Sequence, residues 1–241
     1  MSTTICFDFG NSRFKAAIFK DAELDEIVVL EDASMPTLKN LVEKYKPSKT
    51  ILSSVIHHDQ AIETYLAEIA PFHLIGPNTK LNFTTPVGKP ETIGADRIAL
   101  CAAAVHMYPN RHTLAISLGT CITYNFINNT HEFLGGSISP GMQMRFRSMH
   151  EQTALLPLIK PTKDFPLVGY DTKTNLLSGV VWGMAAEING IIEAYEAKYS
   201  NFNVLLTGGD LSYFVPRLKK RIFADPNLIF KGLYAISETN Q

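Results

Sequence analysis

The chain has 241 residues with 46% hydrophobic and 19% charged side chains, and its 22 basic and 23 acidic residues leave a net charge of −1. These values are typical of a globular protein with one large or two ordinary domains, and they exclude a disordered chain or a basic nucleic-acid-binding arm. The three cysteines, Cys6, Cys101 and Cys121, lie far apart without metal-ligand spacing, which favours a reducing compartment. The sequence shows no secretory leader and no unbroken apolar run of membrane-spanning length, so we expect a cytoplasmic protein with no membrane or nucleic-acid partner.

The chain opens with a predicted β-hairpin. Residues 5–9 alternate between large apolar and smaller or polar side chains, a Gly-Asn-Ser turn follows, and residues 14–19 form a second, mostly apolar run. Asp8 lies near the end of the first strand, where a carboxylate on a largely apolar element requires a partner. A Mg²⁺ ion held through water molecules is one such partner, and an ordinary hairpin with an Asp-capped turn is the structural alternative.

The turn of this hairpin has the composition of an anion-binding site. Gly10 and Asn11 can adopt positive φ angles, which would let backbone N–H groups converge on an anion. Ser12 adds a hydroxyl group, and Lys15 adds a positive charge within short reach. We therefore predict that this turn binds phosphate.

The remainder of the first half alternates strands and helices. The expected elements are strands at 26–30 and 50–55, helices at 38–45, 60–69 and 91–104, and a polar loop at 78–89. This order implies a parallel or mixed sheet whose faces are covered by helices. Thr92 is the expected N-cap of the last helix and Pro109 closes it, which divides the chain into domains at 1–108 and 109–241.

The second half repeats the opening pattern. Residues 114–118 form an apolar run, Gly119 and Thr120 form a turn, and a second strand follows to Ile127. Two such hairpins, each opening one half, indicate a duplicated architecture with two phosphate-facing turns across a cleft, as in actin, sugar kinases and Hsp70 chaperones. A chance match of two hairpins is the alternative.

The rest of the second half is predicted to contain two helices before the last strand. The expected elements are a stiff, bent loop at 133–141, helices at 142–153 and 175–199 joined by a Pro-rich connection, a strand at 203–206, an extended segment at 222–225 and a terminal helix from Lys231. The long helix contains Gly179, Gly183 and Gly190, each of which weakens a helix by about 1 kcal/mol relative to Ala. Close packing against another backbone would compensate, either at a dimer interface or within the same chain.

A second chemical motif, Gly94-Ala95-Asp96-Arg97, comes at the head of an apolar helix. The Asp96 carboxylate could accept the proton of a substrate hydroxyl that attacks a γ-phosphate, and Arg97 could anchor an anionic group of the substrate. The structural alternative is an Asp that caps the helix, with Arg97 on the surface.

Further glycines and hydroxyl groups in the second half could contact a nucleotide. Gly119, Thr120 and Thr123 would offer backbone and hydroxyl groups to phosphate oxygens, although Thr is also ordinary in strands. Gly208 and Gly209 would let an adenosine approach the backbone closely. The sequence has no Walker-type loop and no protein-kinase signature. His57 and His58 could suggest a metal, but an exposed loop pair is the better interpretation because no second ligand cluster follows.

Taken in order, these motifs resemble the type III pantothenate kinases, a family within the actin-like ATPase superfold. The motifs that carry the resemblance are Asp8-Phe9-Gly10-Asn11-Ser12 with Lys15, Gly94-Ala95-Asp96-Arg97, Gly119-Thr120-Cys121-Ile122-Thr123, Gly135-Gly136-Ser137-Ile138-Ser139-Pro140-Gly141, Gly169-Tyr170-Asp171-Thr172 and Thr207-Gly208-Gly209-Asp210. The resemblance spans nearly the whole chain. It implies an α/β fold of two actin-like (ribonuclease H-like) domains, with mixed sheets flanked by helices and a cleft between them.

The resemblance also implies an activity: ATP-dependent phosphorylation of pantothenate, the first committed step towards coenzyme A. By resemblance, Asp8 faces Mg-ATP, Asp96 is the general base, and Arg97 helps to bind pantothenate together with Gly94 and Ala95. The family also implies a homodimer in which Thr172 reaches the substrate of the other subunit.

Three positions depart from the family pattern. Ser117 stands where the family usually has Asp before Gly-Thr, and Asn125 stands where a second Asp often follows the Thr. The first acid is associated with a required monovalent cation, K⁺ or NH₄⁺, which a neutral hydroxyl binds more weakly. Val87 stands where a substrate-contacting Tyr is common, so pantothenate contacts are expected to differ.

Two alternatives to a pantothenate kinase stay open from the sequence. One is a catalytically inactive relative that acts as a regulatory or accessory binding protein, which the three departures favour. The other is the same kinase fold acting on a different hydroxyl substrate, because a fold does not fix its substrate.

Overall fold

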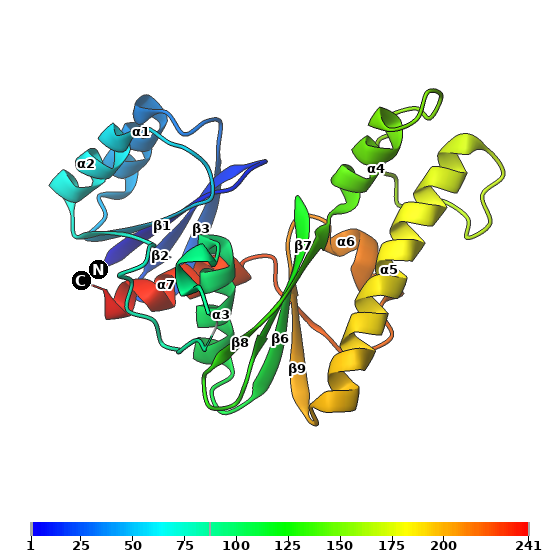
Figure 1. Cartoon of the computed structure of the whole chain (residues 1–241). Helices are drawn as coiled ribbons and strands as arrows, with labels where there is room; N and C mark the ends of the chain where they lie inside the picture. Colours follow the sequence, from blue (N-terminus) through cyan, green and yellow to red (C-terminus); the bar gives the residue numbers. More distant parts are fainter. Residues whose placement is uncertain (1, 87, 241) are drawn as a thin grey trace. The chain divides into compact units, whose positions relative to one another are not determined.

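The computed structural model describes residues 2–86 and 88–240, and within them the chain forms two compact units (Figure 1). The first unit contains the described residues up to 110 together with 129–134 and 227–240, and the second contains 111–128 and 135–226. The expected division at 1–108 and 109–241 differs from these units mainly in two segments, the residues 129–134 (a turn and the start of a strand) and the C-terminal helix. Each unit has one five-stranded sheet with helices packed against it.

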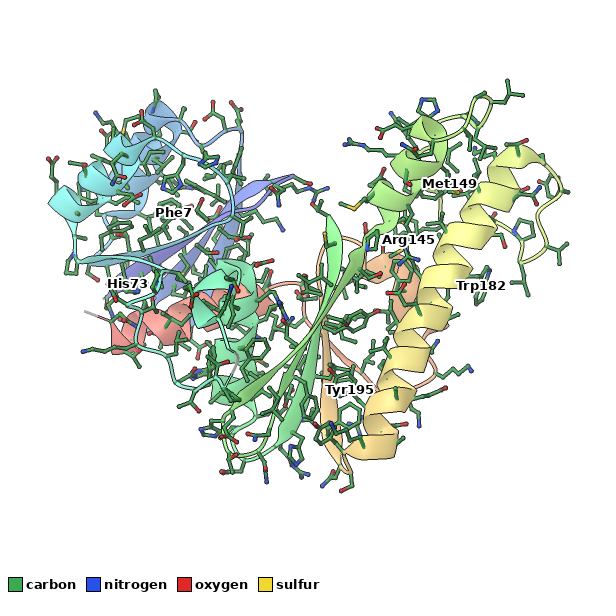
Figure 2. The ribbon with its side chains drawn as sticks, viewed as in Figure 1. Phe7, His73, Arg145, Met149, Trp182 and Tyr195 are labelled. Atoms are coloured by element: carbon green, nitrogen blue, oxygen red, sulfur yellow. The ribbon has the colours of Figure 1, made fainter. Side chains whose placement is uncertain are left out.

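The first unit is built from five strands and four helices among the described residues. Its elements are β1 (Thr3–Phe9), β2 (Phe14–Lys20), β3 (Glu23–Leu30), α1 (Met35–Tyr45), β4 (Lys49–Ser54), α2 (Gln60–Ile69), β5 (Phe72–Leu74), the 3₁₀ turn η1 (Pro90–Thr92), α3 (Ala95–Met107) and α7 (Leu228–Thr239). A core of alternating strand residues, including Ile5, Phe7 and Phe9, packs against Leu38 of α1 and Leu66 of α2. Phe7 lies inside this unit in Figure 2.

The second unit follows the same order of strands and helices. Its elements are β6 (His112–Leu118), β7 (Cys121–Ile127), β8 (Phe133–Pro140), α4 (Met142–Glu151), α5 (Thr172–Lys198), β9 (Phe202–Thr207), α6 (Leu211–Phe214), the 3₁₀ turn η2 (Val215–Arg217) and β10 (Phe223–Ala224). Its core joins Leu114 and Ile116 of β6 to Val181 and Ile188 of α5. By length and composition alone α5 could cross a membrane, but half of its apolar window is buried inside the protein, as in the core helix of a globular protein.

The two sheets share one strand plan. The first has the order β3-β2-β1-β4-β5 and the second the order β8-β7-β6-β9-β10. In each, the first strand pairs antiparallel with the next strand of the chain and parallel with a strand that follows a helical crossover. The predicted duplication is therefore confirmed, and Ser117 of β6 occupies the position that Asp8 occupies in β1.

Three expectations about individual elements were wrong. The expected loop at 133–141 is the strand β8 up to Pro140, because Gly136 allows its backbone to approach β7: a Cβ there would lie 1.8 Å from the Tyr124 carbonyl oxygen. The helix expected from Glu91 begins at Ala95, with Gly94 rather than Thr92 as its N-cap. The C-terminal helix was expected from Lys231 within the second domain. It begins at Leu228 as α7 and packs on α3 in the first unit, and Gly232 makes this close contact possible.

Candidate active site

The carboxylate of Asp8 lies among polar neighbours at the end of β1. Lys15 of β2 and Ser53 of β4 stand directly opposite it in register, and the Ser53 hydroxyl donates a hydrogen bond to Asp8 Oδ1 at 3.4 Å. Burial, and after it the nearby charge of Asp96, raise the pKa of Asp8 from 3.8 to about 6 against the opposing effects of Lys15 and Ser53. A partly buried carboxylate with a raised pKa, with a second carboxylate close by, fits a site for a divalent cation.

The turn after Asp8 differs from the expected one. Gly10 donates its N–H to the Arg13 carbonyl oxygen at 3.1 Å, which closes the turn. Neither Gly10 nor Asn11 has a positive φ, so the expected left-handed conformation was wrong, and phosphate binding by this turn stays a prediction. A Cβ on Gly10 would lie 3.3 Å from the same Arg13 oxygen, so glycine allows the backbone of the turn to pack tightly.

Asp96 sits in the first turn of α3, where its carboxylate folds back onto the helix. Its Oδ1 accepts a hydrogen bond from the Arg97 N–H at 2.9 Å, so the capping interaction that we weighed against a catalytic role is present. A Cβ on Gly94 would lie 2.7 Å from that oxygen, which explains why the motif begins with glycine. Burial raises the pKa of Asp96, while the Arg97 N–H and the Arg97 charge lower it.

Arg97 lies over an aromatic ring in the same unit. Its guanidinium carbon is 5.5 Å from the centre of the Phe133 ring. Phe133 is held by Thr84, whose carbonyl oxygen accepts the Phe133 N–H at 2.8 Å, and by Thr85, whose hydroxyl donates to the Phe133 carbonyl at 3.2 Å. The polar loop before α3 is thereby tied to Arg97. The predicted substrate contact at Val87 lies outside the described residues.

In the second unit, the turn at Gly119 and Thr120 is held between two other glycine-containing segments. Gly141 donates its N–H to the Thr120 carbonyl at 3.0 Å, and a Cβ on Gly141 would lie 2.1 Å from the Gly119 carbonyl oxygen. Gly208, with a φ of +108°, packs so closely that its Cβ would lie 2.2 Å from the Leu118 carbonyl oxygen. Three motifs predicted separately are therefore in contact, whereas Gly209 has open space at the Cβ position among the described residues.

Neutral hydroxyl residues surround Ser117 at the position equivalent to Asp8. Ser117 stands opposite Thr123 of β7 and Thr207 of β9 in register. The Thr123 hydroxyl accepts a hydrogen bond from the Asn125 side-chain amide at 3.2 Å, and the same amide also donates to the Ala115 carbonyl. This region therefore offers hydroxyl and amide groups where the first unit offers a carboxylate.

Thr172 lines a pocket of the second unit. It is the first residue of α5 and lines a largely apolar pocket of about 290 Å³ between α4 and α5, with Met149, Leu156 and Asn175 among the other lining residues. Met149 is labelled on α4 in Figure 2. The pocket does not include the Gly119 turn.

The histidine pair is only partly exposed. His57 is exposed, but the His58 side chain is 10% exposed and contacts Ser54 at 3.0 Å and Glu63 at 3.1 Å, so the exposed pair that we expected was wrong for His58. Asp59 caps α2 through the Ala61 N–H. Among residues 2–86 and 88–240, no group of three or more His, Cys, Asp and Glu side chains could hold a metal.

Sequence reasoning missed Ser53 and Phe133. Ser53 could have been found, because a Ser-Ser pair ends the apolar run at 50–52 and would stand beside Asp8 in a parallel pairing. Phe133 carried no such signal, since its contact with Arg97 joins segments about 36 positions apart.

The fold places the chain in a known class. A ROK family protein from Streptococcus pneumoniae, solved in complex with sucrose, superposes with a TM-score of 0.55 at 12% identity, covering 98% of this chain and 97% of that one. A Campylobacter jejuni protein, provisionally assigned to a Baf family of transcriptional activators, superposes with a TM-score of 0.62 at 23% identity and 98% coverage of both chains. The chain therefore has the two-domain actin-like fold of the sugar kinases.

Sequence comparison identifies the family within this class. The family model for type III pantothenate kinase matches residues 4–194. The type III pantothenate kinases of Christiangramia forsetii and Cytophaga hutchinsonii are each 38% identical to this chain over 98% of its length, and the matches cover 98% and 99% of those proteins. The chain belongs to the type III pantothenate kinase family.

Proposed function

We propose that this protein transfers the γ-phosphoryl group of ATP to the 4′-hydroxyl of pantothenate, which gives 4′-phosphopantothenate for coenzyme A biosynthesis. Family membership along the full chain supports the reaction. The observation that carries the assignment of the site is the pair of partly buried carboxylates, Asp8 and Asp96, which lie close enough in one unit for the charge of Asp96 to raise the pKa of Asp8. Phosphoryl transfer requires one carboxylate for a metal and one for a proton.

Asp8 is the proposed metal-side carboxylate. Mg²⁺ held by Asp8 through water would neutralise charge on the ATP phosphates. The raised pKa of Asp8 supports this role, because a divalent cation relieves the cost of an ionised, partly buried carboxylate. Lys15, opposite Asp8 in register, and the turn at Gly10, Asn11 and Ser12 would contact phosphate oxygens.

Asp96 is the proposed general base. As the pantothenate hydroxyl oxygen attacks the γ-phosphorus, the bond to the ADP oxygen breaks and the hydroxyl proton passes to the Asp96 carboxylate. Burial supports this role because it raises the pKa of Asp96 towards that of an effective base. Arg97, placed over Phe133, would pair with the pantothenate carboxylate beside Gly94 and Ala95.

The second unit would supply neutral groups to the nucleotide. Gly119, Thr120 and Thr123 would contact phosphate, and Gly208 and Gly209 would admit the adenosine. The contacts of Gly141 and Gly208 with the turn support this role, since they fix a backbone that must present its groups in one geometry. A monovalent cation, K⁺ or NH₄⁺, would bind near Ser117 more weakly than at a carboxylate.

The active form is proposed to be a cytoplasmic homodimer without nucleic-acid or membrane partners. A Cβ on Gly179, Gly183 or Gly190 of α5 would meet no described atom from outside its own helical turn within 4 Å, so packing against other described elements does not account for these glycines. Exposed apolar side chains just before α5, including Leu167 and Val168, also support a partner interface in this part of the chain. A partner at this face would bring Thr172 to the substrate of the other subunit.

The inactive, regulatory alternative is less well supported. Asp8, Lys15, Asp96 and Arg97 are all present, and a protein without catalysis would not need two partly buried carboxylates near each other. The net charge of −1 also argues against direct binding to DNA.

A coupled ADP-release assay with pantothenate, Mg²⁺ and ATP tests the proposal. We expect turnover by the wild-type protein, and a loss of about a hundredfold or more in Asp96→Asn with nucleotide binding retained. Runs in K⁺, NH₄⁺ and Na⁺ show whether the neutral Ser117 still supports a cation requirement. Absence of turnover by the folded protein in all three would refute the pantothenate assignment, and wild-type-like rates in Asp96→Asn would refute the base.

A further inference from the structure

An arginine on α4 ties together the segment that supports the Gly119 turn. Arg145 Nε donates to the Pro140 carbonyl at 2.9 Å, and its Nη2 donates to the Ser139 hydroxyl at 3.0 Å. The same Nη2 forms an ion pair with Glu187 of α5. Figure 2 labels Arg145 between the ribbons of α4 and α5. One planar guanidinium therefore joins the end of β8 to a long core helix.

Glu187 is itself fixed from a second direction. Its other carboxylate oxygen accepts the Tyr124 hydroxyl at 3.1 Å, and Tyr124 is buried in β7. Burial raises the pKa of Tyr124, so this phenol remains a neutral donor. The side chains of Arg145 and Glu187 are 24% and 26% exposed, so the pair is partly shielded from water, unlike the more exposed pair of Lys220 with Glu196 at the far end of α5.

The end of β8 leads directly into the residue that holds the turn. Gly141 follows Pro140, donates to the Thr120 carbonyl, and packs on the Gly119 carbonyl closely enough to exclude any Cβ. A shift of Ser139 and Pro140 would therefore be transmitted through Gly141 to the backbone of Gly119 and Thr120. The chain of contacts runs from α5 through Arg145 to the turn.

We propose that Arg145 and Glu187 are positioning residues that set the geometry of the phosphate-binding turn at Gly119 and Thr120 through Gly141. The inference rests on the proposed function of that turn. It predicts a selective defect: interactions with ATP weaken, while interactions with pantothenate, assigned to Asp96 and Arg97 in the other unit, do not. Neither Arg145 nor Glu187 need touch a substrate for this effect.

Steady-state kinetics of Arg145→Gln test the proposal. We expect the KM for ATP to rise by about tenfold or more with the KM for pantothenate within about twofold, because small displacements of positioning groups have large kinetic effects. Arg145→Lys keeps the charge but loses the planar fork of donors, so its KM for ATP should lie between the values of the wild type and Arg145→Gln. Lys220→Gln, which breaks an exposed ion pair with Glu196 of α5, is the matched control and should behave as wild type.

The outcomes separate this inference from the proposed function. If wild-type turnover is present and the KM for ATP changes less than about threefold, or both KM values rise equally, positioning is refuted. If the wild type does not phosphorylate pantothenate, calorimetric titration of Mg-ATP replaces the KM, with the same threefold threshold. If Arg145→Gln does not fold, the near-isosteric Glu187→Gln is judged by the same criteria. Unfolding followed by Trp182 fluorescence shows which variants retain the second unit.

Discussion

Replacement of Asp8 by asparagine should stabilise the metal-free protein while it abolishes turnover. Asp8 is partly buried near the charge of Asp96, and its pKa is raised to about 6, so the ionised form is disfavoured in the folded state. In the unfolded chain the same carboxyl group ionises near its ordinary pKa of 3.8. The folded state therefore loses stability as the pH rises from about 4 through about 6, and the Asp8→Asn variant escapes this loss because its side-chain amide does not titrate.

The expected magnitude follows from the two pKa values. Because one pKa unit is worth about 1.36 kcal/mol, the stabilisation of Asp8→Asn should approach about 3 kcal/mol at pH 8. At pH 4 Asp8 is largely protonated in the folded state, and the advantage should shrink to about 0.5 kcal/mol. The dependence on pH, more than the absolute value, identifies burial of the charge as the cause.

Urea unfolding in EDTA at pH 4, 6 and 8, followed by circular dichroism, measures this difference. Trp182 is the one tryptophan and lies in the second unit, so its fluorescence reports a transition that Asp8→Asn should leave unchanged where the units unfold separately. Added Mg²⁺ should stabilise the wild type but not Asp8→Asn. The coupled assay on the same samples should show that turnover is lost.

Asp32→Asn is the matched control. The Asp32 carboxylate accepts hydrogen bonds from the Ser34 N–H and the Thr37 hydroxyl, which lower its pKa, so its replacement should not stabilise the protein as the pH rises. A stabilisation by Asp8→Asn that is equal at pH 4 and pH 8, or an Asp8→Asn protein that is less stable than wild type at pH 8, would refute the reasoning.

Two further substitutions separate activity from stability. Gly94→Ala places a Cβ 2.7 Å from Asp96 Oδ1, a side-chain atom that can move, so we expect kcat to fall by about ten- to a hundredfold with a loss of about 1 kcal/mol in stability, because Ala is a poor N-cap; a normal kcat in the coupled assay would contradict this. Gly232→Ala places a Cβ 1.8 Å from the Ala99 carbonyl, a backbone atom that cannot rotate away, so α7 must separate from α3 at a cost of about 1–3 kcal/mol in urea unfolding. An unchanged urea midpoint for Gly232→Ala would show that the two helices can move apart freely.

The hairpins and their turns could be predicted because their signal is local. Alternation over residues 5–9, the apolar run at 114–118, and the glycine after each are properties of a few neighbouring residues. The repeated order of strands and helices then limits the topology, and the two sheets show the same strand plan.

The strand β8 was missed because its local sequence argues for a loop. Gly135 and Gly136 have φ angles of +103° and +159°, and Pro140 ends the segment, all of which are typical of turns. Pairing with β7 decides the outcome, and it depends on the absence of a Cβ at Gly136, where the Tyr124 carbonyl approaches. Tertiary contact here overrides local preference.

The start of α3 was misplaced for a related reason. Thr92 has the side chain of a typical N-cap, but its hydroxyl donates to the Lys89 carbonyl instead. Asp96 supplies the capping interaction from inside the helix, and Gly94 leaves room for it. The rule for helix starts therefore fails next to the residue that we propose as the general base, as is common near functional sites.

The duplicated fold also gives a physical reason for the difference between Asp8 and Ser117. Both positions lie at the end of the central strand of a sheet, before a glycine turn. On the proposed function, the first turn meets the phosphates through a cation and needs a carboxylate. The second turn would meet phosphate oxygens with neutral hydroxyl donors, whereas the Asp that the family usually has here would need a cation beside it to offset its repulsion of phosphate. Ser117, flanked in register by Thr123 and Thr207, is consistent with that second task even if the cation of the wider family binds weakly here.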